Sequence, residues 1–540
     1  FDRNGVLLVD SAPAYSLLIT PRYFDPKNIP LLAQLLGVPD SVVANRLAQA
    51  RAWSAYRPSR VFTDLSFETF SRVVENTPAR AAHALGYVRE ITREELGQLQ
   101  QEDYAMGDRI GKAGLEKFYE KALRGVPGRA FKLVNIHGQE IKPYRDGAED
   151  TPPISGYDLH LGLDYRVQAL AESLFVGKRG AAVALDPNSG EIIALVSMPD
   201  FDPEIFARSV DPATWHYLTS SPEKPMFNRA TMSGVPPGST WKPFMALVGL
   251  QEGVITERST IYCGGGYLLG GRLFRCHGGA HGALSVREAI QYSCNTYFFT
   301  VMMRLDVNTF RRWANRFGFG VLAPMDIAEQ NPGLIPDSNY YNRRYPRGWT
   351  PGYTINLGIG QGDMTVTPMQ LARYVAAIAN GGTLYPPHLV RKLVHPETGQ
   401  ELQPKLPPAE HIPIKPEYFE IVREGMRRVM EAGTGRWVQL PGIPSGGKTG
   451  TAQAPGGRKD HSLFIMFAPF DDPKIAIAVL VENAGFGATV AAPIASLMAE
   501  LYLTGQVATT PQRRYMLEHV LRQRSQPLSE TPVVQAAASQ

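Results

Sequence analysis

The sequence lacks several features that would place it in a specialised class of protein. It has no apolar run of the roughly 18 residues that a membrane-spanning helix needs, so no transmembrane helix is predicted within it. Its 55 basic and 51 acidic side chains leave a net charge of only +4, too little to argue for a nucleic-acid partner. No internal repeat of about 20 to 50 residues is found, which argues against a solenoid or a propeller.

Cysteine is also scarce. The chain has three, Cys263, Cys276 and Cys294, all in one short stretch, which is neither a disulfide scaffold nor a usual cytosolic scatter. Three thiolates with one imidazole would make a closed structural zinc site. His281 is the preferred fourth ligand, since His277 is adjacent to Cys276 and less able to converge. Two alternatives stay open: a disulfide between Cys263 and Cys276 with Cys294 as a small buried residue, or three unpaired thiols.

The remaining composition describes an ordinary folded protein. Hydrophobic residues make up 44% and charged residues 20% of the 540 positions, enough for about two to four domains and at least one large core. The 43 prolines and 51 glycines predict many ordered turns. The chain begins at Phe1 without Met, in what looks like a strand, so we expect a preceding segment, either a membrane anchor or a leader.

The order of patterns along the chain predicts an α+β protein. Residues 1–156 mix short strand and helix patterns without a nucleophile context, and we interpret them as a non-catalytic domain that ends in a Pro/Gly/Asp-rich link. Two β-hairpin patterns, at 180–198 and 461–482, predict an antiparallel sheet made from both ends of a second domain at 157–504. Residues 505–540 are polar, with one short helical piece, and are predicted to be a flexible tail. Helices are predicted at 285–295, 367–380, 416–432 and 492–503.

A serine followed by a lysine three residues later occurs three times, at 221–224, 239–242 and 445–448. The first match lies in a polar loop broken by proline, and the last is too rich in glycine to be a helix turn. Only Ser239 and Lys242 follow a Pro-Pro-Gly turn and precede a segment apolar enough to be a buried helix. Because positions i and i+3 share one helical face, this spacing indicates the nucleophile and base of a Ser-Lys acyl-transfer enzyme.

Two further short patterns support this interpretation. Ser293-Cys294-Asn295 is the only S-x-N in the chain, and Lys448-Thr449-Gly450 is the only K-T-G. The order S-x-x-K, S-x-N, K-T-G is the one that β-lactamases and penicillin-binding proteins have. Each match alone is weak, but the three in this order are a specific indication.

With these motifs and the segments around them, the chain resembles the class B penicillin-binding proteins, and among them most closely the penicillin-binding protein 2 group of elongation transpeptidases. The resemblance covers roughly residues 1–503 and does not extend to the tail. Beyond the three motifs, the segments that carry it are 1–5, 82–88, 111–119, 197–203, 227–230, 358–362 and 367–372.

The resemblance implies an α+β transpeptidase domain, in which helices flank an antiparallel sheet and form an all-helical subdomain. An elongated N-terminal α+β pedestal of the dimerisation type would precede it, at residues 1–156. The implied activity is that of a peptidoglycan D,D-transpeptidase, which cross-links stem peptides during cell elongation and which β-lactams inhibit covalently. The chemistry needs no cofactor, so zinc would be structural.

The resemblance also assigns roles to the motif residues. Ser239 would attack the carbonyl of the penultimate D-alanine, with Lys242 as the base. Lys448 would be the second cation that favours the neutral form of Lys242. Ser293 would relay a proton to the leaving D-alanine, and Asn295 would hold the substrate amide.

The strand that carries K-T-G would bind the substrate. Thr449, Gly450 and Thr451 are the predicted binding residues, with the two threonine hydroxyls on the terminal carboxylate. The oxyanion would lie between the backbone N–H groups of Ser239 and Thr451.

The implied partners are D-Ala-D-Ala stem peptides, β-lactams and a SEDS-family (RodA-like) glycosyltransferase that docks on the pedestal. The implied location is the cytoplasmic membrane, with the catalytic domain on the extracytoplasmic side. One alternative is a serine hydrolase of the same fold, namely a D,D-carboxypeptidase, a β-lactamase or a β-lactam sensor, which the large N-terminal domain disfavours. Another is a catalytically silent scaffold, which the intact Ser239, Lys242 and Lys448 disfavour.

Overall fold

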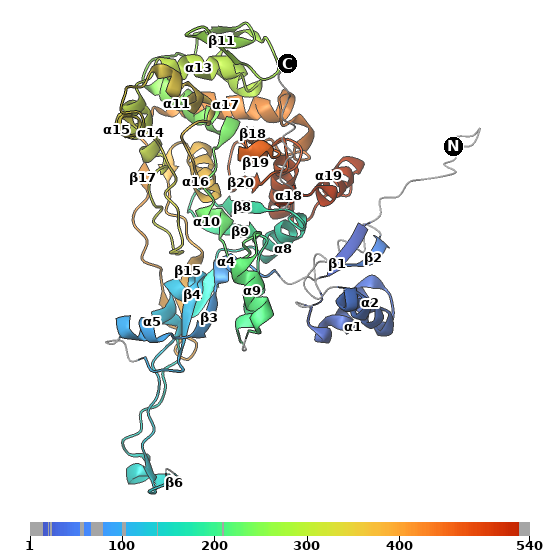
Figure 1. Ribbon diagram of the computed structural model, residues 1–540, viewed down its shortest axis with the longest axis vertical. Helices are drawn as coiled ribbons and strands as arrows, with labels where there is room; N and C mark the ends of the chain where they lie inside the picture. Colours follow the sequence, from blue (N-terminus) through green and yellow to red (C-terminus); the bar gives the residue numbers. More distant parts are fainter. Residues whose placement is uncertain are drawn as a thin grey trace, which may run out of the picture.

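A computed structural model gives the fold of the chain. It describes residues 15–19, 21, 24–53, 59–65, 79–99, 104–137, 139–207 and 210–528, so the segment 1–5 that carries part of the resemblance lies outside the described residues. A large body holds the main sheet and most helices, and the N-terminal elements lie at its lower end (Figure 1). In the part of the chain that is described, no helix is both long and apolar enough to cross a membrane.

The large body is built on a five-stranded antiparallel sheet in the order β18-β19-β20-β8-β9. β20 pairs with β8, with Ala478 opposite Val183, and so joins the two ends of the predicted second domain. The prediction of an α+β fold with an antiparallel sheet made from both ends is therefore confirmed. The strands are β8 (Gly180–Leu185), β9 (Ile192–Met198), β18 (Gly446–Ala452), β19 (His461–Ala468) and β20 (Ile475–Val481).

Helices cover both faces of this sheet. Successive side chains of β20 point to opposite faces, so that Ile477 and Val479 pack under one helical layer while Ala478 and Leu480 pack under the other. Burial on both faces explains why the central strands are nearly continuous apolar runs instead of alternating ones. The first layer contains α8 (Tyr165–Leu174), α18 (Ala491–Thr504) and α19 (Pro511–Arg522), and the second contains α16 (Pro368–Ala379).

A helical subdomain lies above the sheet (Figure 1). Gly425 of α17 packs so closely on α12 that a Cβ there would come within 2.8 Å of the Ile290 Cδ1 atom. The predicted helix at 285–295 is wrong as a single element: α12 ends at Gln291 and α13 starts at Asn295, because Ser293 has a left-handed φ of 55°. The helices are α11 (Lys242–Gln251), α12 (Val286–Gln291), α13 (Asn295–Met303), α14 (Val307–Arg316), α15 (Ser338–Arg344) and α17 (Pro416–Ala432).

Two small hairpins at the top of this subdomain carry two of the three cysteines. Cys263 ends β10, and Cys276 follows β12 directly. The hairpins pair β10 (Ile261–Cys263) with β13 (Gly282–Leu284) and β11 (Gly266–Leu269) with β12 (Arg272–Arg275).

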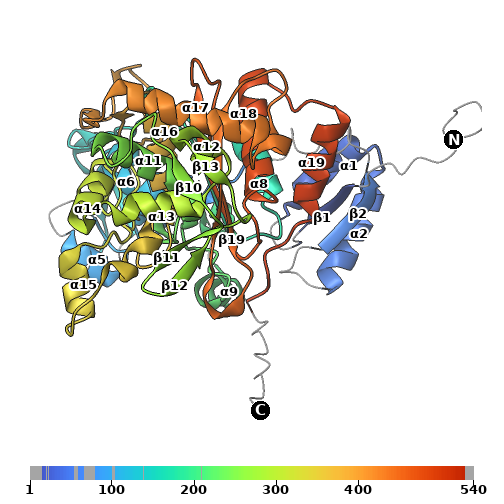
Figure 2. The same ribbon diagram turned by 90° about the horizontal axis from the view of Figure 1, so that it is seen from above.

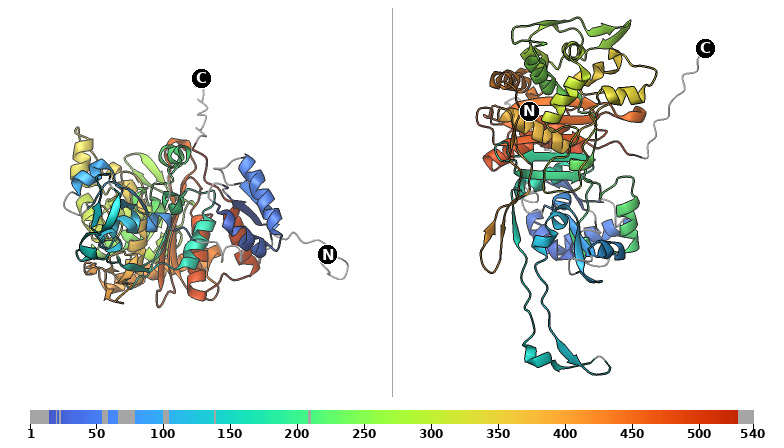
Figure 3. Two further views of the ribbon diagram at one scale, coloured as in Figure 1. Left: turned by 90° about the horizontal axis from the view of Figure 1, so that it is seen from below. Right: turned by 90° about the vertical axis from the view of Figure 1, so that its left-hand side faces the viewer.

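The predicted pedestal consists of small units. One is the pair β1–β2 with α1 and α2 packed on it, and another is the pair β3–β4 with α4 and α6. The ribbon β5–β6 extends far from the rest of the molecule, and all its strand residues are exposed (Figure 3). The elements are β1 (Tyr15–Ile19), α1 (Ile29–Leu36), α2 (Asp40–Trp53), β2 (Ser59–Leu65), α4 (Ala82–Leu85), β3 (Tyr87–Glu90), α5 (Arg93–Gln98), β4 (Arg109–Ala113), α6 (Gly114–Phe118), α7 (Glu120–Leu123), β5 (Lys132–Val134) and β6 (Glu140–Pro143).

After the pedestal the chain enters the large body through β7, which pairs with β15 in a three-stranded sheet with β16. The domain boundary between 156 and 157 stays a prediction. The remaining elements are β7 (Asp158–Leu161), α9 (Pro212–Ser220), α10 (Arg229–Met232), β14 (Thr383–Leu384), β15 (Val390–Val394), β16 (Glu401–Leu402) and β17 (Glu410–His411).

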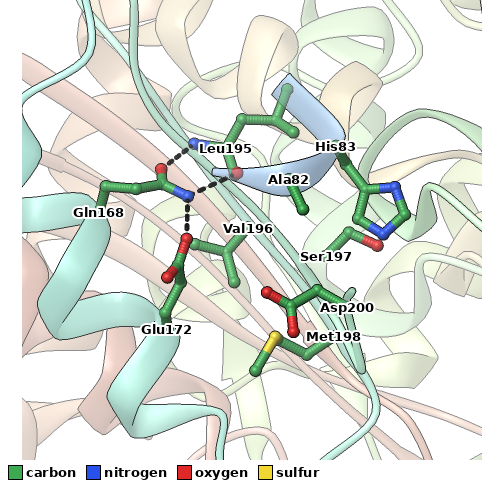
Figure 4. A pocket seen from close by; sticks show the side chains of 9 residues that line it. All are labelled: Ala82, His83, Gln168, Glu172, Leu195, Val196, Ser197, Met198 and Asp200. Atoms are coloured by element: carbon green, nitrogen blue, oxygen red, sulfur yellow. Dashed lines mark hydrogen bonds between the residues drawn. The ribbon is translucent and has the colours of Figure 1, made fainter. Parts of the chain in front are cut away.

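Two buried carboxylates, Glu172 of α8 and Asp200 after β9, lie beside the start of α4 in the pedestal (Figure 4 shows them near Ala82 and His83). Glu172 of α8 accepts hydrogen bonds from the backbone N–H groups of Arg80 and Ala81, at 2.9 and 2.8 Å, and from the Gln168 amide at 2.9 Å. The Arg80 guanidinium forms an ion pair with Asp200 at 3.0 Å. Burial raises the pKa of Asp200 to about 7, because desolvation disfavours its charged form. These contacts fix the start of α4 on the main body.

The prediction that residues 505–540 form a flexible tail is wrong for residues 511–528. Met516, Leu517 and Val520 of α19 are buried in the core beside α18. Arg513 is 1% exposed and donates to the buried Glu500, with 2.6 Å between Nε and Oε2. The short helical piece predicted in this segment is confirmed as α19, but the polar composition did not reveal its buried apolar face or its buried ion pair.

Candidate active site

Ser239 lies in the 3-10 turn Gly238–Trp241, and α11 begins at the next residue, Lys242. Residues i and i+3 of a 3-10 turn eclipse each other, so the predicted common face of Ser239 and Lys242 is retained. Gly238 has a φ of 56°, and a Cβ there would come within 2.5 Å of the Thr451 carbonyl oxygen. Ser239 is half-buried while the three residues that follow it are buried, so the serine faces the surface of the turn.

Lys242 is fully buried and makes three polar contacts. Its Nζ donates to the Ser293 carbonyl oxygen at 2.7 Å, to Ser293 Oγ at 3.0 Å and to Asn295 Oδ1 at 2.7 Å. Burial lowers the pKa of Lys242 to about 7, an effect that negative charge on Cys276 and Cys294 partly opposes. A lysine with this pKa is neutral in a large fraction of molecules at neutral pH and can accept a proton.

Lys448 of β18 approaches Ser293 from another side. Its Nζ donates to Ser293 Oγ at 2.9 Å and to the Thr449 carbonyl oxygen at 3.1 Å. Burial, and after it the charge of Lys242, holds the pKa of Lys448 well below its usual range. The Ser293 hydroxyl therefore lies within hydrogen-bond distance of both lysines, which gives a continuous path for a proton between them.

The S-x-N turn, residues 293–295, is held by backbone bonds to α12, from Ser293 N–H to the Ile290 carbonyl oxygen and from Cys294 N–H to the Ala289 carbonyl oxygen, and by several side chains. Asn295 accepts from Lys242, and its Nδ2 donates to the Arg275 carbonyl oxygen at 3.4 Å. The Asn295 backbone N–H donates to Cys276 Sγ at 3.2 Å. The position of the turn thus depends on Lys242 and on the hairpins that carry the cysteines.

Strand β18 carries the three residues predicted to bind substrate. Its backbone pairs with β19 over its whole length, with Thr449 opposite Phe464. A Cβ on Gly450 would come within 2.7 Å of Thr240 Cγ2, so glycine lets the strand approach the turn that holds Ser239. The structure therefore brings together Lys242, Ser293, Asn295 and Lys448, and packs β18 against the turn that carries Ser239.

Three residues that the motifs did not predict contact this strand. The hydroxyls of Thr434 and Thr449 share a hydrogen bond of 2.7 Å. Gln361 Nε2 donates to the Thr451 carbonyl oxygen at 3.2 Å, and the Gly487 N–H donates to Thr451 Oγ1 at 3.4 Å. Gln361 falls within 358–362, one of the segments that carry the resemblance, so the sequence could have indicated it as a site residue. Thr434 and Gly487 lie in loops that no motif marks.

The four predicted zinc ligands also come together. The ligand atoms of Cys263, Cys276, His281 and Cys294 lie within 4.8 Å of one another, and the three cysteines are free thiols. His281 Nδ1 is 3.6 Å from Cys263 Sγ and 3.5 Å from Cys276 Sγ. The hydrogen bond between the Cys276 and Cys294 sulfurs lowers the pKa of Cys276, so this sulfur favours the thiolate form that metals bind.

The donor set, and the distance between the Cys276 and Cys294 sulfurs, fit a tetrahedral zinc ion. Zinc–sulfur bonds of about 2.3 Å in a regular tetrahedron place two sulfurs about 3.8 Å apart. The Cys276 and Cys294 sulfurs are 3.8 Å apart. A closed set of three sulfurs and one imidazole leaves no open position, which is typical of a structural site.

The comparisons with known proteins agree with this geometry. The sequence matches the family described as "Penicillin binding protein transpeptidase domain" over residues 180–500, and the "Penicillin-binding Protein dimerisation domain" over residues 1–79 and 77–161. The peptidoglycan D,D-transpeptidase MrdA of Acinetobacter baumannii is 33% identical over 532 residues, which cover 91% of this chain and 78% of the relative.

Two solved structures are similar over most of their length. Pseudomonas aeruginosa PBP2 in complex with WCK 5153 aligns with a TM-score of 0.69 at 34% identity, covering 80% of this chain and 91% of that chain. A chain from a study of how a peptidoglycan synthase complex coordinates polymerization and crosslinking aligns with a TM-score of 0.69 at 28% identity, covering 92% and 88%.

Proposed function

We propose that this chain, which belongs to the penicillin-binding protein transpeptidase family, is a peptidoglycan D,D-transpeptidase that cross-links stem peptides during cell elongation through a serine acyl-enzyme. The observation that carries the proposal is the buried Lys242, which follows the Ser239 turn directly and contacts both Ser293 and Asn295. A buried lysine with a pKa of about 7 is an effective base for a serine hydroxyl.

In the first half-reaction, Ser239 Oγ attacks the carbonyl carbon of the penultimate D-alanine, and its proton passes to Lys242. The developing oxyanion lies between the backbone N–H groups of Ser239 and Thr451. The peptide C–N bond then breaks, and the terminal D-alanine leaves after its nitrogen takes a proton through Ser293. Its carboxylate is bound by the hydroxyls of Thr449 and Thr451 on β18.

In the second half-reaction, an amine of a neighbouring stem peptide attacks the ester carbonyl of the acyl-enzyme. Asn295 holds the substrate amide while the new amide bond forms. The ester C–O bond breaks, and Ser239 recovers its proton from the amine by way of Lys242. Lys242, protonated at this stage of both steps, favours the negative tetrahedral intermediates.

Mass spectrometry after treatment with a labelled penicillin tests the nucleophile. The expected result is one adduct, on the peptide that contains Ser239, and no adduct in a Ser239→Ala variant. The adduct should last much longer than the acyl-enzyme of a hydrolase, which is released within one turnover. Rapid release of the label would instead identify a hydrolase of the same fold. An adduct on another serine, or cross-linking of stem peptides by Ser239→Ala, would contradict the proposal.

A structural zinc ion is the second part of the proposal. Cys263, Cys276, His281 and Cys294 would hold it, and because Cys294 lies inside the S-x-N motif the metal would tie Ser293 and Asn295 to the cysteine hairpins. Metal analysis of the purified protein is expected to find about one zinc per chain, and a chelator is expected to lower the melting temperature. Protein without metal, whose melting temperature a chelator does not change, would contradict it.

The third part concerns location and partners. Peptidoglycan is assembled outside the cytoplasmic membrane, so the catalytic domain would work on that side, and membrane anchoring stays a prediction. The pedestal would dock a SEDS-family (RodA-like) glycosyltransferase, since a similar chain comes from a synthase complex that coordinates polymerization with crosslinking. Co-purification of that glycosyltransferase with the full chain, lost when the pedestal surface is altered, is the expected result.

A further inference from the structure

Residues 511–528 (the C-terminal clasp) lie beyond residue 500, where the match to the transpeptidase family ends. In this segment α19 lies beside α18 at the flank of the large body (Figure 2). Arg513 anchors it: besides the ion pair with Glu500, its Nη1 donates to Ser496 Oγ at 2.9 Å and its Nη2 to the Ser496 carbonyl oxygen at 3.1 Å. These contacts attach the clasp to α18, in the large body that carries the candidate active site.

In this position α19 contacts the β20–α18 turn, residues 482–490. His519 Nε2 donates to the Thr489 carbonyl oxygen at 3.0 Å. The His519 ring lies edge-on to Trp437, with 5.8 Å between ring centroids, and Trp437 Nε1 donates to the Ala488 carbonyl oxygen at 3.0 Å. The end of the turn that leads into α18 is thus held from the side of α19.

The extended residues after α19 hold the other end of the same turn. Ser525 Oγ accepts from the Arg179 backbone N–H at 2.9 Å and donates to the Glu482 carbonyl oxygen at 2.7 Å. The Gln526 N–H donates to the Asn483 carbonyl oxygen at 3.1 Å. Asn483 is 4% exposed and has a left-handed φ of 52°, a conformation that needs such support in a non-glycine residue.

The clasp also holds the β18–β19 turn, residues 453–460. Gln526 Oε1 accepts from the Lys459 backbone N–H at 2.9 Å, and the Asn483 side chain donates to the Lys459 carbonyl oxygen at 3.0 Å. The Gly485 N–H donates to the Asp460 carbonyl oxygen at 2.9 Å. Gln526 therefore contacts both turns that flank the C-terminal end of β18.

The β20–α18 turn in turn contacts the substrate-binding end of β18. A Cβ on Gly487 would come within 2.1 Å of the Gly450 carbonyl oxygen, so the turn and the strand are in close backbone contact. The Gly487 N–H donates to the hydroxyl of Thr451 at 3.4 Å. A shift of the turn would move Gly487 against Gly450 or away from Thr451.

We propose that the C-terminal clasp is a positioning element of the active site, in which Ser525 and Gln526 hold the two turns that fix Thr451 for substrate. The proposal rests on the proposed function for its role in catalysis. Ser525 and Gln526 touch no reacting atom, and act through Asn483, Lys459 and Gly487. A segment outside the family match thereby supports Thr451 and the adjacent Gly450, at the C-terminal end of β18.

Two matched pairs of variants test this. The first compares a chain that ends at Arg524 with one that ends at Leu528, which keeps every contact named above. The second compares Gln526→Met, which removes the acceptor for the Lys459 N–H, with Gln526→Glu, which keeps it. The readouts are the second-order rate constant of acylation by a fluorescent penicillin, amide hydrogen exchange of residues 449–451 and 483–487, and the melting temperature.

The expected result is a fall of about fivefold in acylation for Gln526→Met and a larger one for the chain ending at Arg524, the size expected from one or more lost hydrogen bonds. Exchange at 449–451 and 483–487 should rise by a similar factor, whereas the Gln526→Glu variant and the chain ending at Leu528 should stay within about twofold of the full chain. A lower melting temperature with unchanged acylation and exchange would overturn the proposal, because the clasp would then only stabilise the fold. If penicillin failed to acylate even the full chain, the proposed function would fail, while hydrogen exchange would still decide the role of the clasp.

Discussion

The two groups of residues that meet beside Ser239 are positioned in different ways. Strand β18 is fixed by main-chain pairing with β19 along its whole length, and glycine at 450 lets it contact the Ser239 turn. The S-x-N turn has no strand ladder. It consists of Ser293 in a left-handed conformation and Asn295 at the start of a helix. Two backbone bonds tie it to the end of α12, and the rest of its support comes from Lys242, Cys276 and the hairpins around them.

This difference between β18 and the S-x-N turn predicts which substitutions each of them tolerates. A backbone ladder is insensitive to side chains that point away from it but sensitive to any atom that enters the strand's contact surface. A turn held by side chains is sensitive to each of those side chains, however far each lies from the substrate. In the proposed function, the substrate would bind between a side fixed mainly by strand pairing and a side fixed mainly by polar contacts and a predicted metal ion.

Lys242→Met should have the largest effect, because it removes both the base and the main support of the S-x-N turn. We expect acylation by penicillin to fall by about 10⁴-fold or more. The melting temperature should also fall, because the Ser293 carbonyl oxygen and Asn295 Oδ1 lose their buried donor. Stopped-flow acylation and a melting curve measure the two effects separately.

Lys474→Met is the matched control, because Lys474 lies in the β19–β20 turn and its side chain is 53% exposed. It should acylate at the rate of the unchanged chain. A Lys242→Met protein that retained more than about a hundredth of the rate would show that another group accepts the Ser239 proton.

Gly450→Ala tests the strand side of the site. The added Cβ would lie 2.7 Å from Thr240 Cγ2 and 3.2 Å from the Pro237 carbonyl oxygen, so β18 or the Ser239 turn must move. A misplacement of about 1 Å can cost about 100-fold in rate, and we expect a loss of that order in acylation. Gly97→Ala in α5, where a Cβ would meet nothing within 4 Å, is the control. Equal acylation rates for the two variants would contradict the close contact between β18 and the turn.

The sequence predicted the strand side better than the turn side. Lys448, Thr449 and Gly450 are adjacent in the chain, and strand pairing carries that adjacency directly into space. The hairpin around 461–482 was visible because its apolar runs are bounded by a turn. The sheet made from both ends of the domain followed from those hairpins and is confirmed.

What the sequence did not predict depends on contacts between distant residues. The left-handed Ser293 splits a helix that periodicity predicted as continuous. Its conformation is supported by backbone bonds to the end of α12, from the Ser293 N–H to the Ile290 carbonyl oxygen and from the Cys294 N–H to the Ala289 carbonyl oxygen, and by the distant Lys242. Thr434 reaches Thr449 from the loop after α17 without any motif. Within 511–528 the helix was predicted, but its packing was not: the segment was interpreted as a tail because its sequence is polar, and the burial of Arg513 depends on Glu500 of α18.

The pH dependence of the acylation rate should follow the protonation state of Lys242. Its neutral form accepts the proton, and burial lowers its pKa to about 7, so the rate should rise with pH and level off above about pH 7. Below that value a tenfold loss per pH unit is expected. A rate that stays constant between about pH 5 and 8 would exclude Lys242 as the titrating base.

The same group predicts a stability trend of known sign. Lys242 releases its proton near pH 7 in the folded chain but near its usual pKa of 10.5 in the unfolded chain. Between these values the unfolded state binds more protons, so the contribution of Lys242 to stability becomes more favourable as pH rises through this window. The Lys242→Met variant should lack this contribution, which denaturant unfolding at several pH values would measure.

The smallest effect on rate is expected for His281→Ala, with His277→Ala as its control. This pair also tests most directly whether the S-x-N turn and strand β18 are held independently. Only His281 belongs to the sulfur and nitrogen cluster, so His281→Ala should lose zinc and several degrees of melting temperature, while His277→Ala keeps its metal. Acylation should fall by about fivefold in His281→Ala, as expected when contacts that hold Ser293 and Asn295 weaken. Hydrogen exchange should rise at residues 293–296 but not in β18, because the ladder with β19 does not depend on the cluster. If hydrogen exchange rose equally at residues 293–296 and in β18, the S-x-N turn and β18 would be one cooperative unit. Pairing with β19 would then not hold the strand independently.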